Sequence, residues 1–180
     1  MLDKLHAKAA PSLNKLPIKA QSAYVDLLFA VISRALVSAS RTDPVIQAEV
    51  KAFPVGHRLR MMVLPKGQHF TLEVTERSEL TLVDSPLSEP ADLTVKFKQL
   101  SLAFRVFSLQ ESTAAAFASD RIVADGDVSD AIRLVRCLNR VEAVILPKSL
   151  ASLAIKSYPE MSLSEKLGTA TKIFGGFFKK

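Results

Sequence analysis

The residues that could bind a metal ion are few and far apart in the sequence. Three histidines, His6, His57 and His69, and one cysteine, Cys137, occur in 180 residues. A protein zinc site needs several His, Cys or carboxylate ligands brought together, typically at characteristic spacings. His57 and His69 could face each other across a hairpin, but two partly exposed strand histidines is the simpler interpretation. We therefore expect no metal site and no cofactor.

Signals for covalent or phosphate chemistry are equally weak. Cys137 lies within a helical pattern beside Leu138, which is typical of a small buried apolar residue rather than a nucleophile. The six glycines form no G-x-G-x-x-G or G-K-[ST] pattern, and no serine stands in a G-x-S-x-G elbow. We interpret Asp125-Gly126-Asp127 as a turn followed by a helix cap. The sequence therefore predicts a protein with no catalytic residues, not an enzyme.

The composition favours binding of something apolar. The mean hydropathy is +0.20, which is high for a chain with 23% charged residues. The start of the chain is charged where a secretion signal would be apolar, and the single cysteine cannot form an internal disulfide. The longest apolar stretch, residues 24–38, is shorter than the about 20 residues that a membrane span needs. We expect a cytoplasmic protein, at most peripheral to the inner face of the membrane.

The net charge of +6 is concentrated at the two ends of the chain. Residues 1–60 carry nine basic and four acidic side chains, and residues 121–180 carry ten and six, whereas residues 61–120 carry five and eight. Basic ends suit anionic lipid or nucleic acid. There is no tryptophan, and no aromatic and basic strand motif of the RNA-binding kind is present. We expect a membrane surface rather than nucleic acid as the partner.

Hydrophobic periodicity predicts helices before and after a sheet. Pro17 should begin a helix that runs to about Ser38, and Asp43 should cap a second helix that starts at Pro44. Alternation and turn signals predict strands at 57–64, 69–75, 79–84, 91–97 and 121–124. Further helices are expected at 98–107, 111–119, 127–145 and from 147 onward.

This order of elements predicts the fold class. The short connections between the first four strands favour an antiparallel meander. We therefore expect an α+β fold, with a five-stranded, mostly antiparallel sheet covered by helices on one face. Three parts are expected along the chain: a basic N-terminal segment at 1–16, a folded domain at 17–159 and a C-terminal tail at 160–180.

The tail is predicted to be an amphipathic helix. Its apolar residues are spaced by three and four, so that they form one stripe, and the chain ends on two lysines. Such a stripe can lie in a membrane interface, close a groove of the domain, or dock on a partner. Packing as an ordinary last helix remains open. The candidate membrane or lid residues are Leu163, Leu167, Phe174, Phe177 and Phe178.

Residues 91–145 resemble the sterol carrier protein 2 (SCP2) lipid-binding domain. The residues that carry the resemblance are Phe117, Arg121-Ile122-Val123, Gly126-Asp127, Ala131 and Leu134. The order of elements is also similar over about residues 25–157, although the glycine that the family often has between its two middle helices is missing at 107–110. The resemblance implies a hydrophobic tunnel between sheet and helices that holds acyl chains, sterols or other lipids.

A narrower resemblance is to the SCP2-type accessory factors of bacterial ubiquinone biosynthesis. It is carried by the opening MLDKL, by the chain length and by the stretch from RIVADGD to ILPKSL. The resemblance implies that a polyprenylated quinone precursor is presented to water-soluble biosynthetic enzymes.

Our leading hypothesis is a lipid carrier that holds an acyl chain or an isoprenoid in a hydrophobic tunnel. The driving force would be burial of the chain, about 0.8 kcal/mol per methylene. The alternative is a non-catalytic interaction module that docks through its C-terminal helix. The candidate pocket residues, chosen because they should point inward, are Tyr24, Leu28, Ile32, Met61, Phe70, Leu72, Leu93, Phe104, Phe117, Leu134 and Leu138.

Overall fold

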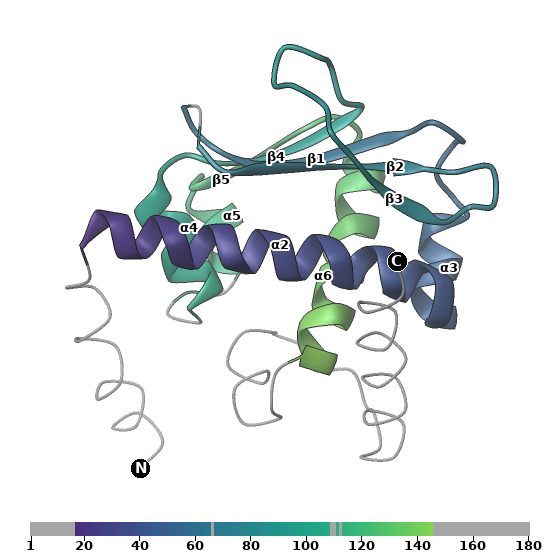
Figure 1. The fold of residues 1–180 in the computed structure, drawn as a ribbon, viewed down its shortest axis with the longest axis horizontal. Coiled ribbons are helices and arrows are strands. Elements are labelled where there is room, and N and C mark those ends of the chain that lie inside the picture. Colours follow the sequence, from purple (N-terminus) through teal and green to yellow (C-terminus); the bar gives the residue numbers. More distant parts are fainter. Residues whose placement is uncertain (1–16, 66, 109–110, 112, 146–180) are drawn as a thin grey trace.

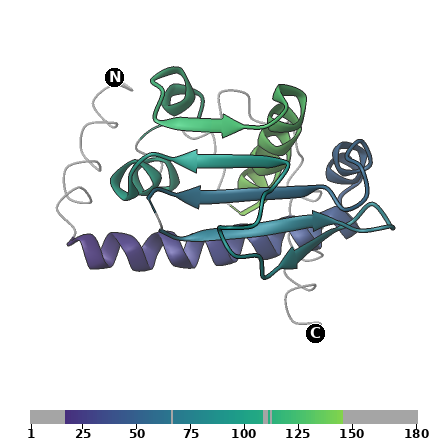
Figure 2. The same cartoon turned by 90° about the horizontal axis from the view of Figure 1, so that it is seen from above.

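A five-stranded sheet and a layer of helices on one of its faces form the fold (Figures 1 and 2). The computed structural model describes residues 17–65, 67–108, 111 and 113–145. The elements are, in chain order, α2 (Ile18–Thr42), α3 (Pro44–Val50), β1 (Arg58–Val63), β2 (His69–Val74), β3 (Leu80–Val83), β4 (Leu93–Phe97), α4 (Leu100–Phe107), α5 (Thr113–Ala118), β5 (Ile122–Asp125) and α6 (Val128–Ile145). The predicted α+β class is confirmed.

Helix α2 extends four residues beyond the predicted end at Ser38. The prediction followed the apolar spacing, which ends near Ser38, and serine side chains often bond to the backbone outside helices. Here the Ser40 hydroxyl donates to the Val37 carbonyl at 2.8 Å and accepts from the Leu80 N–H of β3 at 2.9 Å. Ser40 is 1% exposed. Its hydroxyl therefore joins helix to sheet, and the helix continues.

The predicted start of α3 is confirmed. The Asp43 carboxylate accepts from the backbone N–H groups of Val45 and Ile46 at 2.9 and 3.3 Å, and Pro44 occupies the first turn. The other Asp43 oxygen accepts from Nε of Arg140 in α6 at 2.9 Å. Asp43 therefore caps α3 and also joins the α2–α3 corner to α6.

The turn before α6 also follows the prediction. Gly126 has φ +140°, and a Cβ there would lie 2.4 Å from the Asp92 carbonyl oxygen, so the position requires glycine. The Asp127 carboxylate accepts from the Ser129 N–H at 2.7 Å. This bond satisfies one of the free donors at the start of the helix.

The strand order is β3-β2-β1-β4-β5. Three neighbouring pairs are antiparallel, but β1 and β4 are parallel, with Leu59 opposite Leu93 and Val63 opposite Phe97. The predicted meander is therefore wrong at the fourth strand. Residues 84–92 cross the face of the sheet that lies away from the helices (Figure 1). β4 then pairs with β1, where nearly all side chains of both strands are buried.

The core lies between the sheet and the helices. Side chains from α2, α4 and α6 pack against the inward residues of the strands in one continuous hydrophobic cluster. Alternation in β2 is as predicted, since Phe70, Leu72 and Val74 are 8%, 0% and 1% exposed. The cluster therefore occupies the space in which the sequence placed a lipid tunnel.

Candidate functional site

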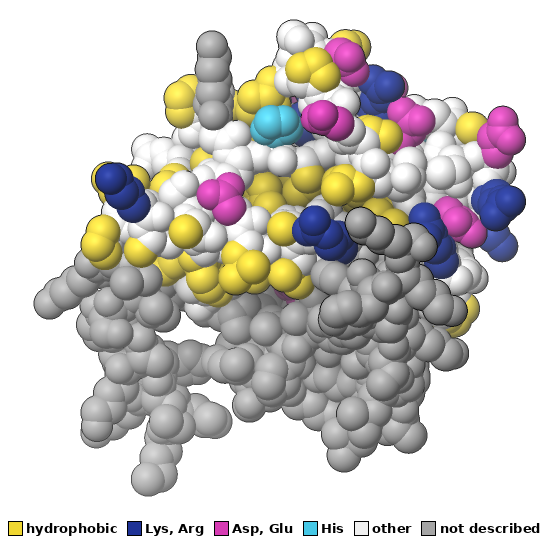
Figure 3. All heavy atoms as spheres, viewed as in Figure 1, with side chains coloured by type: hydrophobic (Ala, Val, Ile, Leu, Met, Phe, Trp, Pro, Cys, Tyr) yellow, Lys and Arg dark blue, Asp and Glu magenta, His cyan; other side chains and the backbone are white. Residues whose placement is uncertain are grey.

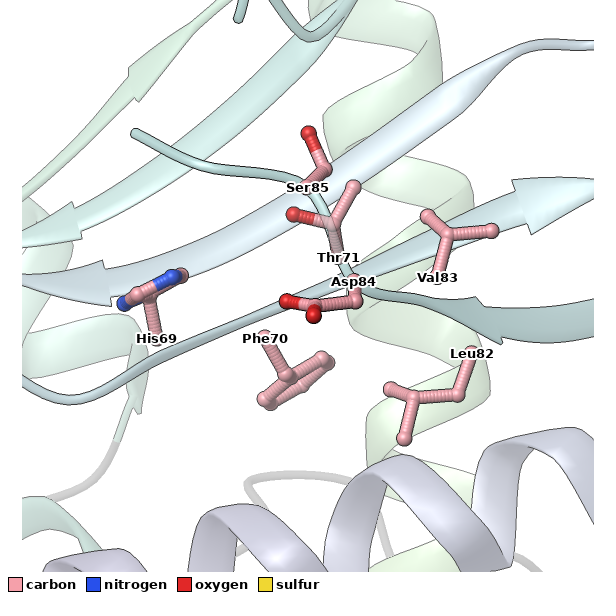
Figure 4. A pocket seen from close by; sticks show the side chains of 7 residues that line it. All are labelled: His69, Phe70, Thr71, Leu82, Val83, Asp84 and Ser85. Atoms are coloured by element: carbon pink, nitrogen blue, oxygen red, sulfur yellow. The ribbon is translucent and has the colours of Figure 1, made fainter. Parts of the chain in front are cut away.

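A pocket of about 400 Å³ opens at the free edge of the sheet, where β3 ends and β2 continues (Figure 4). We call it the edge notch. Its size is within the range of small-molecule sites in proteins, about 300–1,000 Å³. The residues that line it are His69, Phe70, Thr71, Leu82, Val83, Asp84 and Ser85.

The register of the strands creates the edge notch. β3 pairs with β2 from Val83, opposite Thr71, to Leu80, so among the described residues no strand pairs with His69 and Phe70 on that side. After Val83 the chain leaves the edge and crosses the outer face of the sheet. Alternation turns Phe70 and Leu82 toward α2, and Thr71 and Val83 away from it (Figure 4).

The inner side of the edge notch is aromatic. The Phe70 ring lies edge-on to Phe29 of α2, with centroids 5.3 Å apart. Phe29 also lies 5.5 Å from Phe107 and 6.4 Å from Phe97, and these two rings are 5.2 Å apart. We call these four rings the aromatic cluster. It extends from the edge notch into the interface between sheet and helices, so an apolar chain that enters beside Phe70 meets aromatic side chains first.

The outer side of the edge notch is polar. His69 and Asp84 are exposed at its mouth. Leu82 lies beside them and is 46% exposed. Hydrophobic side chains also gather over α2 on the face shown in Figure 3. An apolar interior with a few polar groups at the mouth suits an amphiphilic ligand whose head remains near water.

Arg60 of β1 connects two of the residues that line the edge notch, Thr71 and Ser85, which form its outer wall. The Arg60 side chain points to the outer face and is 3% exposed. Its Nε donates to the Thr71 hydroxyl at 3.0 Å, and Nη2 donates to the Ser85 hydroxyl at 2.8 Å. Sequence reasoning missed this role. The available signal was an arginine in the middle of a strand, with Leu59 and Met61 on either side of it.

The predicted pocket residues mostly lie in or against one core. Phe70 also lines the edge notch. Tyr24 and Phe117 are partly buried against the core, and the Tyr24 hydroxyl donates to the Phe107 carbonyl at 3.2 Å. Leu28 is partly exposed on α2. The remaining candidates are buried in the cluster: Ile32, Met61, Leu72, Leu93, Phe104, Leu134 and Leu138.

That these residues contact a ligand is still a prediction. Leu82 and Asp84 were not predicted, because their place in the site depends on where β3 ends. The predicted lid residues, Leu163, Leu167, Phe174, Phe177 and Phe178, lie outside the described residues.

The groups that could be reactive lie apart from one another. Cys137 is 2% exposed, and burial, with smaller effects of Glu49 and Asp43, raises the pKa of its thiol to about 12. The thiol is therefore protonated at neutral pH. Nε2 of His57 lies 3.0 Å from the Asp130 carboxylate, whereas His69 lies opposite Met62.

The two histidines therefore do not face each other, contrary to the arrangement we considered from the sequence. Within the described part of the chain, no three His, Cys, Asp or Glu side chains are placed to hold a metal ion.

Helix α2 is long and apolar enough to cross a membrane by length and composition. In the fold, 44% of its most apolar window is buried against the sheet and other helices. The core helix of a folded domain passes the same test, so this property is weak support for a membrane span.

Comparison with known proteins gives structural likenesses only. No protein-family model matches the chain, and no curated protein matches it by sequence. A UbiJ-SCP2 ubiquinone synthesis protein is 16% identical with a TM-score of 0.44, covering 69% of this chain and 99% of that one. Apo sterol carrier protein 2 from Yarrowia lipolytica is 14% identical with a TM-score of 0.44, covering 67% and 93%.

A third similar structure is the sterol carrier protein domain 2 of Helicoverpa armigera. It is 16% identical with a TM-score of 0.39, and the match covers 61% of this chain and 84% of that one. All three of these solved structures are described as SCP2 or sterol carrier protein domains.

Proposed function

We propose that this protein is a non-catalytic carrier that binds the apolar chain of a lipid at the edge notch. The observation that supports it is the arrangement of the notch: Phe70 and Leu82 on the inner side, and His69 and Asp84 at the mouth. An apolar chain would lie along the Phe70 side toward α2, and its head would remain at the polar mouth.

Burial of the chain would supply the binding energy. At about 0.8 kcal/mol per methylene, ten buried methylenes contribute roughly 8 kcal/mol before the costs of association are subtracted. Because this energy is not directional, the interior would distinguish chain types poorly. Selectivity would then depend on the polar mouth.

Finer proposals rest on the sequence. The resemblance carried by RIVADGD to ILPKSL favours an isoprenoid chain, such as that of a ubiquinone precursor, and biosynthetic enzymes as recipients. The basic ends of the chain favour work at an anionic membrane surface from the cytoplasm. The tail at 160–180 would either contact that membrane or close the pocket.

The test begins with the purified full-length protein. Native mass spectrometry followed by solvent extraction would show whether a lipid copurifies. A fatty acid carrying an NBD fluorophore then serves as the probe in a titration. We expect one probe per chain, with fluorescence enhanced by its apolar surroundings.

A variant of a lining residue locates the site. Leu82→Lys places a charge beside the apolar interior at a position that is 46% exposed, so folding should be little affected. Loss of part of a leucine contact should weaken probe binding about tenfold. The matched control is Val128→Lys, which changes a 73% exposed valine on α6 and should not alter binding.

Equal probe binding by both variants would remove the edge notch from the proposal. A protein that purifies without lipid, and does not bind the probe, would contradict the carrier function. That outcome favours the alternative of an interaction module that docks through residues 160–180.

A further inference from the structure

The wall of the edge notch belongs to a segment that has no regular secondary structure. Residues 84–92, which we call the strap, run from the end of β3 across the outer face of the sheet to the start of β4 (Figures 1 and 2). Asp84 and Ser85, at its beginning, line the edge notch. The shape of the notch therefore depends on where the strap lies on the sheet.

The Arg60 side chain forms hydrogen bonds both to strand β2 and to the strap. Its guanidinium donates to Thr71 of β2 and to three groups of the strap. Thr71 and Ser85, two lining residues of the notch, are thus attached to the same guanidinium through their hydroxyls. The strap contacts are the Ser85 hydroxyl at 2.8 Å, the Pro86 carbonyl at 3.2 Å and the Glu89 carbonyl at 2.7 Å.

The chemistry of these contacts is specific to arginine. The acceptors are hydroxyl and carbonyl oxygens, and within the described part of the chain no carboxylate lies within ion-pair distance of Arg60. A buried charge is costly unless its donors are satisfied, so the strap must stay in place for Arg60 to stay buried. A lysine has a single nitrogen and cannot reach acceptors on three sides of a planar fork.

A second contact holds the same segment from its outer side. The Glu89 carboxylate accepts from the Ser85 hydroxyl at 3.1 Å and from Nη1 of Arg58 at 2.9 Å. Arg58 is 35% exposed, so this ion pair is well hydrated and adds less than the buried contacts. At its far end the strap is held by Asp92, whose carboxylate accepts from the Arg58 backbone N–H at 2.8 Å. The part of the strap beside the edge notch is held mainly by Arg60.

We infer that Arg60 is a positioning residue: it fixes the strap over β2 and thereby sets the width of the edge notch. The effect of Arg60 on ligand binding rests on the proposed function. The effect of Arg60 on the position of the strap does not, because its hydrogen bonds to the strap are present without a ligand.

The test is Arg60→Met in the full-length protein, with Arg34→Met as the matched control. Arg34 is exposed on α2, and its guanidinium donates to the Ala30 carbonyl of its own helix. Hydrogen exchange measured by mass spectrometry reports on the strap without any ligand. The amide to follow in the strap is that of Glu89, whose N–H donates to the Pro86 carbonyl at 3.0 Å. We expect its exchange to be at least about tenfold faster in Arg60→Met, with β1 and β4 still protected.

Ser85→Ala serves as a milder variant, in case Arg60→Met does not fold. It removes one bond to Arg60 and should speed exchange in the strap several-fold. Arg60→Lys retains the charge but should not restore protection to the strap.

Binding of the NBD fatty acid is then measured for the same variants. Faster exchange of the strap together with weaker binding, in Arg60→Met but not in Arg34→Met, supports the inference. Unchanged exchange in both Arg60→Met and Ser85→Ala overturns it. Faster exchange with unchanged binding also overturns it, because the strap then does not shape the site. If the wild-type protein fails to bind the probe, the proposed function fails, and the exchange data alone decide whether Arg60 holds the strap.

Discussion

The contact between Asp43 and Arg140 allows two stabilising effects to be separated by substitution. One Asp43 oxygen accepts from the Val45 and Ile46 N–H groups and caps α3, while the other accepts from Arg140. The side chains of Asp43 and Arg140 are 1% and 10% exposed. Asp43→Asn can keep the cap while removing the charge, whereas Asp43→Ala removes both.

The magnitudes follow from the burial. Removing one partner of a buried ion pair costs about 3–5 kcal/mol, because the other charge is left without compensation. Losing a helix cap costs about 1 kcal/mol more. We therefore expect the free energy of unfolding to fall by roughly 3–5 kcal/mol in Asp43→Asn and by about 1 kcal/mol more in Asp43→Ala.

Urea denaturation at pH 7, followed by circular dichroism, measures both changes. Asp125→Asn is the control, since Asp125 pairs with Lys96 at 2.7 Å but is 69% exposed. Such a hydrated surface pair contributes little to stability. Equal losses in Asp43→Asn and Asp43→Ala would show that the cap contributes nothing separate. A loss in Asp43→Asn no larger than in Asp125→Asn would refute the reasoning from burial.

Two further predictions concern buried titratable groups. Burial raises the pKa of the Glu142 carboxyl from 4.5 to about 7. As pH rises, the Glu142 carboxyl loses its proton at a lower pH in the unfolded chain than in the folded protein. The free energy of unfolding should therefore fall as pH rises from 4.5 to 7 and remain lower above pH 7. Glu142→Gln should remove this dependence and raise stability at pH 8 by about 3 kcal/mol, as urea denaturation at pH 5 and pH 8 would show; equal pH dependence in both proteins would contradict it. Cys137 should react with a thiol reagent such as DTNB at least about a hundredfold faster in 6 M urea than in buffer, because its thiol is buried and its pKa is raised; rapid reaction of the folded protein would contradict this.

Much of the local structure could be predicted from the sequence, because it depends on neighbouring residues. Asp43-Pro44 specifies a cap and a first turn, and the alternation in Phe70-Thr71-Leu72 specifies a strand whose Phe70 and Leu72 face the core. The pairing of β4 with β1 could not be predicted in this way. A strand pattern gives the faces of the strand but not its partner, and residues 84–92 carry no signal that they cross the sheet.

The site was less predictable than the fold for a related reason. The candidate pocket residues were chosen because their position in the strand or helix pattern should point them inward. A side chain in a solid core points inward in the same way, so this criterion selected Met61 and Leu72 but not Leu82. Leu82 and Asp84 belong to the site because β3 stops at Val83. That end is set by the tertiary course of the strap, and so is the burial of Arg60.

The parallel pairing of β1 with β4 has a consequence for the order of folding. β1, β2 and β3 are joined by short turns and can form as a local unit, and so can β4, α4, α5 and β5. The two units meet in the sheet only through the ladder from Leu59–Leu93 to Val63–Phe97. Such non-local parallel pairs form slowly, because a long loop must close before any contact is gained. We expect this ladder to close last. The strap beside the edge notch would then reach its final position in the same step that joins the two parts of the sheet.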